Sequence, residues 1–448
     1  MKTSRRTFLG CAGAAPFILP GSIWAADVKP SERLNMGIIG TGKMAQGIMN
    51  NFRGMDEVQI VAVCDVDSFR RTAAQERLNE YYKSNPKKGT ADVKAYRDYR
   101  ELLADPKIDI VYVGTPDHWH ASVTVAALKA GKDVYCEKPL THNIMEAVAV
   151  MTAVKKYNRV LQTGSQQRSS KEFRIAAELV RNGVLGKIKS VNVFFGGAPK
   201  PYDMKAEPME PGLDWDFWCG PGPVVDYNSK LSAHGIPDFW PNWRGFREFG
   251  TGGVGDWGAH MLDIAHWGLD MDNSGPVEIT PPADGKNHGT VLKYPTGVEV
   301  IHTSGQGGVT FNGENGMVRV HRGQFELVMN GQPFSRFWDK KVDTGTSCEA
   351  AYTKAEKTFL KDAKVHLYTA PRGGHTRNFV DCVKSREKPG ANELIGAHTV
   401  IGCHLILQSY YHREKMNWDP VNFRFTNGTG NPAWLTREYR QGYGFPAV

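Results

Sequence analysis

Short apolar runs alternate with helical segments through the first third of the chain. Buried strands are predicted at residues 34–39, 58–63, 108–113, 133–136 and about 159–163, with helices at about 67–84, 99–104, 117–130 and 144–156. Regular strand–helix alternation is typical of a parallel sheet with helices on both faces. We therefore predict a doubly wound, Rossmann-type α/β domain over residues 33–165.

From about residue 187 the pattern changes to short alternating segments. Strands are predicted at 188–195 and at about 290–294, 298–303, 317–321 and 325–329, separated by Gly and Asn turns, and helices at 376–384 and 393–411. This pattern is typical of an open, largely antiparallel sheet with one covered face. Because 448 residues exceed what one hydrophobic core usually supports, residues 166–448 are assigned to a second, α+β domain.

Residues 198–250 form a long irregular stretch that is rich in Pro, Gly and Trp. A loop of this length inside a compact domain is usually functional or disordered, and its aromatic content argues against disorder. Because aromatic faces stack on sugar rings, we interpret the stretch as a substrate lid, with Trp243 and Arg244 as candidate substrate contacts. A packed aromatic plug or a subunit contact is the alternative.

The N-terminus has the order of features found in an export signal. Paired arginines, Arg5 and Arg6, precede a modest apolar run that ends in Ala25-Ala26. This order resembles a twin-arginine signal peptide, which we expect over residues 1–26. The protein is therefore expected in the periplasm, and since that route carries folded proteins, a cofactor can be bound before export.

Composition and charge narrow the partners further. Part of the net charge of +8 belongs to the leader and the remaining basic residues are dispersed, so no nucleic-acid partner is expected. No stretch reaches the roughly 18 continuous apolar residues of a membrane span. The six cysteines after the leader form no CxxC pair, which favours buried thiols and no metal site.

A glycine-rich turn follows the first strand, where Gly40-Thr41-Gly42-Lys43-Met44-Ala45 forms a G-x-G-x-x-A pattern and begins a helix. The first glycine permits the tight turn, the second lets a pyrophosphate approach, and the alanine allows close helix–strand packing. The second strand ends at Asp65, whose carboxylate can accept from both ribose hydroxyls and would repel a 2′-phosphate. The pattern predicts NAD as the cofactor in preference to NADP.

Further polar side chains follow the carboxyl ends of the later strands, where doubly wound sheets bind ligands. Asp117 is expected to cap the helix that follows the third strand. Candidate cofactor contacts near the nicotinamide are Thr115, Pro116, His118, His120, Glu137 and Lys138. Gln167 and Arg168, after the fifth strand, are candidate substrate contacts, with a surface salt bridge as the alternative.

The stretch 252–267 brings an acid and an imidazole together. Its glycines are interpreted as a flexible entry, and Asp256 as the N-terminal end of a helix that carries His260 one turn later and Asp263 on the same face. A carboxylate and an imidazole at this spacing suit proton transfer with a hydroxyl group. Alternatively, Asp256 only caps the helix and His260 is a core histidine.

Four motifs in one order resemble the Gfo/Idh/MocA oxidoreductases, relatives of glucose–fructose oxidoreductase and inositol 2-dehydrogenase. They are G-x-G-x-x-A at 40–45, T-P-x-x-x-H at 115–120, E-K-P at 137–139 and D-x-x-x-H at 256–260. The resemblance implies that Lys138, Asp256 and His260 form a catalytic triad, in which the lysine hydrogen-bonds the reacting hydroxyl beside the nicotinamide. It also implies a homo-oligomer joined through the open face of the second sheet.

The expected function is that of an exported NAD(H)-dependent oxidoreductase acting on a secondary hydroxyl of a sugar, polyol or glycoside. Since no soluble NAD pool is expected outside the cytoplasm, the cofactor is expected to stay bound. The alternative is a redox-neutral glycoside hydrolase or lyase, as in glycoside hydrolase family 109, which oxidises a sugar hydroxyl transiently. A sugar-binding protein on an inactive Rossmann fold is disfavoured by the intact motifs.

Overall fold

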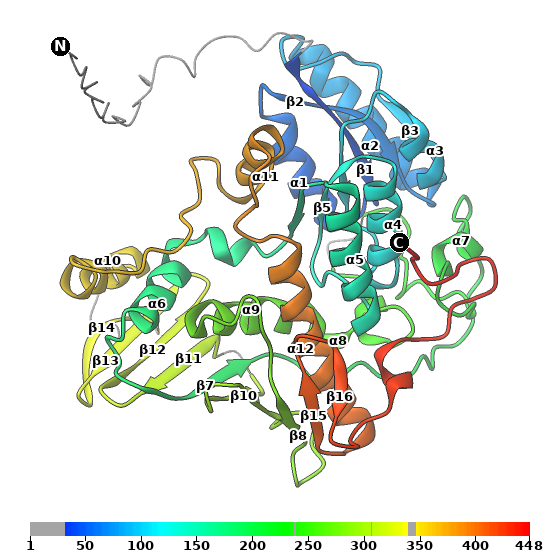
Figure 1. The fold of residues 1–448 in the computed structure, drawn as a ribbon. Helices are drawn as coiled ribbons and strands as arrows, with labels where there is room; N and C mark the ends of the chain where they lie inside the picture. The colour runs from blue at the N-terminus through cyan, green and yellow to red at the C-terminus, as the bar shows by residue number, and fades with distance from the viewer. Residues whose placement is uncertain (1–31, 237–238, 306, 339–345) are drawn as a thin grey trace, which may run out of the picture.

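The computed structural model describes residues 32–236, 239–305, 307–338 and 346–448, so the expected signal peptide lies outside the described residues. Its first domain is built on a six-stranded sheet in which all neighbouring strands are parallel (Figure 1). The strands are β1 (Leu34–Ile39), β2 (Val58–Cys64), β3 (Lys94–Tyr96), β4 (Ile110–Val113), β5 (Asp133–Cys136) and β6 (Leu161–Thr163). The predicted Rossmann-type architecture is confirmed.

The strand order is β3-β2-β1-β4-β5-β6. Successive strands are added on one side of β1 as far as β3, and from β4 onward on its other side, so the order of addition reverses between β1 and β4. Ligands of doubly wound sheets bind outside the carboxyl ends of the strands at such a reversal. The helices of this domain are α1 (Lys43–Arg53), α2 (Ser68–Ser84), α3 (Tyr99–Ala104), α4 (Asp117–Lys129) and α5 (Ile144–Tyr157). Strand β3 was not predicted, because it is a short edge strand with no buried residue to mark it.

The second sheet has ten strands in the order β14-β13-β12-β11-β7-β10-β9-β8-β15-β16. The strands are β7 (Ile188–Phe194), β8 (Glu278–Thr280), β9 (Val291–Lys293), β10 (Glu299–Thr303), β11 (Val309–Gly313), β12 (Gly316–His321), β13 (Gln324–Met329), β14 (Gln332–Phe337), β15 (Met416–Asp419) and β16 (Arg424–Thr426). Strands β7 and β10 pair in parallel, and β7 pairs with β11 in the antiparallel sense. The predicted, mostly antiparallel sheet is therefore confirmed. Strands β8, β11, β14, β15 and β16 were not predicted.

Helices cover one face of this second sheet. They are α6 (Lys171–Arg181), α9 (Gly258–Leu269) and α10 (Cys348–Phe359), of which α6 and α10 were not predicted (Figure 1). Val191, Val193 and Phe311 are fully buried beneath α9, while the intervening Asn192 and Asn312 on the opposite face are half-buried. The alternation of buried and half-buried positions is what a sheet with one covered face requires.

Helix α11 (Gly374–Ser385) returns to the first domain late in the chain and lies beside α1 (Figure 1). Phe379 and Val380 are fully buried in the core of the first sheet, and Arg377 forms an ion pair with Glu57 at 2.8 Å. Helix α12 (Glu393–His412) then packs against α5. The first domain is thus completed by a segment that the boundary predicted at residue 165 did not include.

The irregular stretch 198–250 builds a small aromatic core of its own. Helix α7 (Trp215–Cys219) places Trp215 and Trp218 in a stacked pair with ring centroids 4.6 Å apart. These rings pack with Tyr227, Trp243 and other apolar side chains of the same stretch. Most of its aromatic residues are therefore structural, and a smaller set reaches the cavity described below.

Three further observations concern the described ranges. No helix there combines the length and apolar character that crossing a membrane requires. No group of three or more His, Cys, Asp or Glu side chains in those ranges is arranged to hold a metal ion. The six cysteines that the structure describes are free thiols, five of them buried.

Candidate active site

A cavity of about 450 Å³ lies at the carboxyl edge of the first sheet, beside the reversal between β1 and β4. Its walls come from the turns after β1, β2, β4 and β5, from the stretch 198–250 and from the start of α9. The predicted site residues among its lining are Gly40, Gly42, Lys43, Met44, Asp65, Thr115, Pro116, His120, Glu137, Lys138, Trp243, Arg244, Asp256 and His260. Two distant halves of the chain therefore contribute to one site.

The turn after β1 is shaped to receive a phosphate group. Gly40 has φ +86°, and a Cβ there would lie 2.7 Å from the backbone of Gly114, so only glycine fits. Gly42 begins α1 without a side-chain cap, and nothing lies within 4 Å of where its Cβ would be. The start of α1 therefore leaves room for a pyrophosphate beside its uncapped first turn.

Asp65 is held in place at the end of β2. One carboxylate oxygen accepts from the backbone N and Oγ1 of Thr41, at 2.8 and 3.0 Å, and the other accepts from the backbone N of Asp67 at 3.0 Å. Thr41 itself is buried and does not line the cavity, so it acts by orienting Asp65. A carboxylate fixed here fits the ribose hydroxyls of NAD, and these residues together suit that cofactor.

Lys138 and Asp256 meet in the cavity as the sequence predicted. The Lys138 ammonium contacts the Asp256 carboxylate and donates to its backbone oxygen at 3.0 Å. Arg244 approaches the same carboxylate, with Nε 3.9 Å from Oδ1. Burial alone would raise the pKa of Asp256, but the charges of Lys138 and Arg244 hold it below its usual value. Asp256 is therefore an anion that holds the lysine in position.

His260 is a buried, neutral imidazole in the same cavity, with 4% of its surface exposed. Burial, together with the positive charges of Lys138 and Arg322, holds its pKa well below the usual value. Its Nδ1 has no hydrogen-bond partner in the part of the chain that the structure describes. A neutral imidazole with a spare nitrogen can accept a proton from a bound hydroxyl.

The helix that carries these residues differs from the prediction. Helix α8 (Gly252–Asp256) precedes α9, and Trp257 separates them, so Asp256 ends a helical turn and does not begin one. Its carboxylate faces Lys138 and caps no helix. The glycines are packed, not a flexible entry, because a Cβ on Gly253 would lie 2.4 Å from Cα of Gly196.

Thr115, His120 and Glu137 form the floor of the cavity. The ring nitrogens of His120 face the carbonyls of Thr115 at 2.9 Å and Pro139 at 2.6 Å, which ties the two turns together. Burial raises the pKa of Glu137 to about 7, and Gln166 donates to its carboxyl at 3.3 Å. Glu137 Oε2 and Thr115 Oγ1 lack partners among the described residues, as does His260 Nδ1. Three residues that line one cavity thus carry unsatisfied polar atoms, which is typical of a ligand site.

His118 and Asp117 have roles that differ from those predicted. His118 is fully buried, and its ring nitrogens face the carbonyls of Trp218 at 3.1 Å and Phe249 at 3.3 Å. It therefore connects the stretch 198–250 to α4 and does not line the nicotinamide side of the cavity.

Asp117 does not cap α4. Its carboxylate accepts from the backbone N and Oγ1 of Thr251, and burial raises its pKa to about 7.

The predicted substrate contacts after β6 are wrong for Arg168. Its side chain is 1% exposed and forms ion pairs with Asp263 at 2.8 Å and Asp272 at 2.6 Å, outside the cavity. Asp263, which pairs with Arg168, therefore does not line the cavity with Asp256 and His260 as the prediction of a shared helix face had it. Gln167 lies behind the site, where it contacts the carbonyl of His260 and accepts from Arg322. Gln166, the residue before it, lines the cavity instead.

Trp257 and Arg322 are among the cavity residues that the sequence reasoning missed. Trp257 is 39% exposed and lies in the chain between the two predicted catalytic residues. The signal available in the sequence was its place directly after Asp256, inside the D-x-x-x-H motif. Arg322 arrives from the turn between β12 and β13 and lies over the Trp257 ring at 5.0 Å. No local motif marks Arg322, because its place depends on the register of the second sheet.

Comparison with known proteins agrees with this geometry. Residues 34–165 match the family described as "Oxidoreductase family, NAD-binding Rossmann fold", and residues 186–317 match its C-terminal alpha/beta domain, so the two matches span more than half of the chain. The chain is 30% identical over 171 residues to myo-inositol 2-dehydrogenase of Thermotoga maritima, which is 38% of this chain and 48% of that protein.

Two other relatives illustrate the range of the family. The chain is 26% identical over 176 residues to glycosyl hydrolase family 109 protein 2 of Shewanella sp. (strain ANA-3), 39% of this chain and 38% of that protein. It thus spans less than half the length of these curated relatives. The solved structure of levoglucosan dehydrogenase in complex with NADH and levoglucosan has a TM-score of 0.57 and 17% identity, covering 86% of this chain and 99% of the other.

The two family matches agree with the six-stranded parallel sheet, the glycine turn and the fixed Asp65 in the first half, and with the mixed sheet in the second. The chain belongs to the Gfo/Idh/MocA family of oxidoreductases, and its first domain is the NAD-binding Rossmann fold of that family.

Proposed function

We propose that this protein is an exported NAD-dependent oxidoreductase that acts on a secondary hydroxyl of a sugar, polyol or glycoside. The observation that carries the proposal is the convergence of Lys138, Asp256 and His260 from two domains on one cavity, at the mouth of the nucleotide-binding sheet. This is the arrangement that alcohol oxidation needs, since one group must position the oxygen and another must take its proton.

The role of each side chain follows from its charge and surroundings. Bound NAD supplies a hydride acceptor at this site. The Lys138 ammonium donates a hydrogen bond to the substrate oxygen and stabilises negative charge that develops on it. Asp256 holds the lysine in position, and neutral His260 accepts the hydroxyl proton. Because His260 is neutral when buried, it is ready as a base near neutral pH.

The stretch 198–250 supports retention of the cofactor. Arg70 of α2 donates from Nε to the carbonyl of Gly235 at 2.8 Å and from Nη1 to Ser232 Oγ at 3.1 Å, while Ser68 N donates to Gly212 O at 3.0 Å. The Lys43 ammonium lies 5.5 Å from the Trp240 ring centroid. These contacts join the stretch to the nucleotide half of the cavity, which favours retention of a bound nucleotide.

Location and assembly form part of the same proposal. The twin-arginine pattern supports export to the periplasm, where a retained cofactor has an evident advantage. The half-buried face of the second sheet, which includes Asn192 and Asn312, offers a surface for a second copy of the chain. Light scattering after size exclusion would test assembly, and fractionation of cells with and without an Arg5→Lys, Arg6→Lys leader would test export.

The central test combines cofactor content with turnover. Protein purified without added nucleotide is denatured, and the released nucleotide is quantified as NAD or NADP. Carbohydrates are then screened for NADH formation with the wild type and with Lys138→Ala. Bound NAD together with turnover that depends on Lys138 supports the proposal. Protein that is empty and also fails to bind added NAD would refute it.

A redox-neutral glycosidase is the second candidate. It is favoured by the similarity to a glycosyl hydrolase family 109 protein and by the contacts that enclose the nucleotide half of the cavity. Transient oxidation of a ring hydroxyl acidifies the neighbouring C–H, so that elimination, addition of water and re-reduction can follow without net redox change. Free sugar released from a glycoside without accumulation of NADH would identify this activity, whereas stoichiometric NADH would identify the dehydrogenase.

A further inference from the structure

The substrate end of the cavity carries more positive than negative charge. Lys138, Arg244 and Arg322 line it, while Asp256 is the carboxylate that contacts two of them. Two other acids, Asp117 and Glu137, also line the cavity, but burial raises the pKa of each to about 7, so that near neutral pH each carries only part of its negative charge. A neutral sugar would leave this excess of cationic charge uncompensated.

Arg322 is the least engaged of the three cations. Its Nε donates to Gln167 Oε1 at 3.2 Å, and its guanidinium stacks on the Trp257 ring at 5.0 Å, which fixes the plane of the group. Within the described part of the chain its two Nη groups have no hydrogen-bond partner, and no carboxylate forms an ion pair with it. A planar guanidinium held in this way presents two parallel donors, the geometry that matches a carboxylate.

Trp257 connects Arg322 to the reacting groups. The centroids of the Trp257 and His260 rings are 6.1 Å apart, and Arg322 Cζ lies 5.0 Å from the Trp257 centroid. Arg244 also lines the cavity, stacked on Trp243 at 4.2 Å and with Nε 3.9 Å from the Asp256 carboxylate. A sugar ring beside Trp257 would therefore have its reacting hydroxyl near His260 and an exocyclic group near Arg322.

We infer that the substrate is an acidic sugar, a uronic acid or a glycoside of one, whose carboxylate is bound by the Nη groups of Arg322. The inference rests on the proposed function and names the substrate class of that same site. Arg322 is exposed at the cavity, so its Nη groups are open to a carboxylate that enters from solvent, and Arg244 adds long-range attraction. Arg322 is thus a residue that determines specificity and takes no part in the proton transfer.

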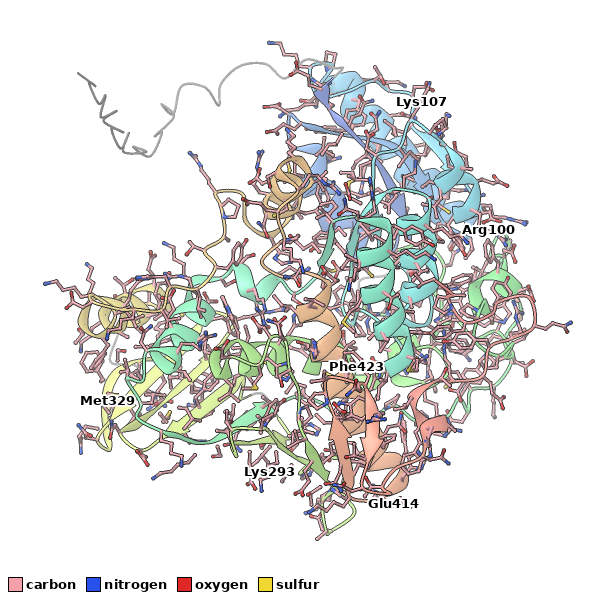
Figure 2. The ribbon with its side chains drawn as sticks, in the orientation of Figure 1. Arg100, Lys107, Lys293, Met329, Glu414 and Phe423 are labelled. Atoms are coloured by element: carbon pink, nitrogen blue, oxygen red, sulfur yellow. The ribbon has the colours of Figure 1, made fainter. Side chains whose placement is uncertain are left out.

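The experiment compares charged and neutral substrates with matched variants. The full-length protein with bound NAD is assayed with glucuronate, galacturonate, glucose, galactose and glucose 6-phosphate, and binding is measured in parallel by the shift in Tm that each sugar produces. Arg322→Gln removes the proposed contact. Lys293→Gln is the charge-matched control, because Lys293 is exposed on β9 at the edge of the molecule (Figure 2).

The expected result is that uronates have the highest kcat/KM. The assays are run at about pH 8, where His260 is neutral with or without the charge of Arg322. Arg322→Gln should then lower kcat/KM for uronates by about 10- to 100-fold, the usual worth of a charge-assisted hydrogen bond, and change it less than about threefold for glucose. Lys293→Gln should change neither. The Tm shift produced by glucuronate should disappear in Arg322→Gln while NAD content stays the same.

Several outcomes would overturn the inference. They are a preference for neutral sugars, a preference for glucose 6-phosphate over uronates, and equal losses on charged and neutral sugars in Arg322→Gln. In each of these cases sugars still reduce bound NAD, so the proposed function stands. If no sugar of any charge is turned over or shifts Tm while NAD is bound, the proposed function fails together with the inference.

Discussion

Replacement of Arg168 by Met tests whether this residue belongs to the substrate site or to the core. Its guanidinium donates to Asp263 at 2.9 Å and to Asp272 at 2.6 and 2.9 Å, and it lies over the Trp267 ring at 5.1 Å. The Asp263 side chain is fully buried, so Arg168→Met would leave at least one carboxylate without compensation inside the protein.

The magnitude follows from this burial. Removing one partner of a buried ion pair typically destabilises a protein by about 3–5 kcal/mol, a large part of the roughly 5–15 kcal/mol by which proteins are stable. At about 2 °C per kcal/mol for a large domain, the melting temperature should fall by about 6–10 °C. Burial already raises the pKa of Asp263, and without Arg168 it would rise further. The folded variant would then hold a proton that the unfolded chain releases, so the deficit should shrink as pH falls from 8 to 5.

The assay is thermal unfolding by circular dichroism, combined with KM for the sugar and nucleotide content. Arg168→Met should retain its KM and NAD content within about twofold at a temperature where it is folded. Lys200→Met is the control, since its pair with Asp203 has side chains that are 56% and 58% exposed and should contribute at most about 1 kcal/mol. A tenfold rise in the KM for the sugar without loss of Tm would refute the structural role and restore Arg168 to the substrate site.

Three further predictions concern the cofactor turn, the lysine and the histidine. Gly42→Val should fold normally, because no atom lies within 4 Å of the added Cβ, but calorimetry should show NAD binding at least tenfold weaker. Gly40→Ala should instead lower the free energy of unfolding in urea by about 1–3 kcal/mol, because the residue has a positive φ and its Cβ would lie 2.7 Å from backbone atoms. Lys138→Ala should reduce kcat by about 10²- to 10³-fold in stopped-flow NADH formation while NAD content is unchanged, and a loss below fivefold would contradict its role. Because the pKa of His260 is lowered, its neutral, basic form persists to acidic pH. As pH is reduced, kcat/KM should therefore not begin to fall until pH is below 6.5. A fall in kcat/KM centred at pH 6.5 or higher would contradict the assignment of a neutral imidazole.

The nucleotide site could be predicted because its determinants are close together in the sequence. A buried strand, the turn at Gly40 and Gly42, and a carboxylate at the end of the next strand form one strand–turn–helix unit. Each of these features imposes its own geometry: glycine permits the positive φ, and the strand end places Asp65 at the sheet edge. The hydrophobic pattern likewise distinguished the two sheets. Continuous apolar runs between helices predicted the parallel sheet, and short alternating segments predicted the antiparallel one, because both patterns are local properties of the sequence.

The pairing of Lys138 with Asp256 and His260 was anticipated from motifs, but its orientation was not. Asp256 was expected to begin a helix and instead ends one, α8, which packs against Gly196 too closely for any residue but glycine at 253. The carboxylate at the end of this helix contacts Lys138. A sequence pattern cannot contain this information, since Gly196 lies far away along the chain.

The sequence by itself determined the fold class, the cofactor turn and the identity of three converging side chains. Tertiary structure alone decided that Gln166 and not Arg168 faces the cavity, that His118 fastens a loop, and that Arg322 reaches the site from a distant hairpin. The physical reason is that periodicity and turn chemistry act over a few residues. The ion pair of Arg168 with Asp272 and the pairing of β7 with β11 instead join segments more than a hundred residues apart.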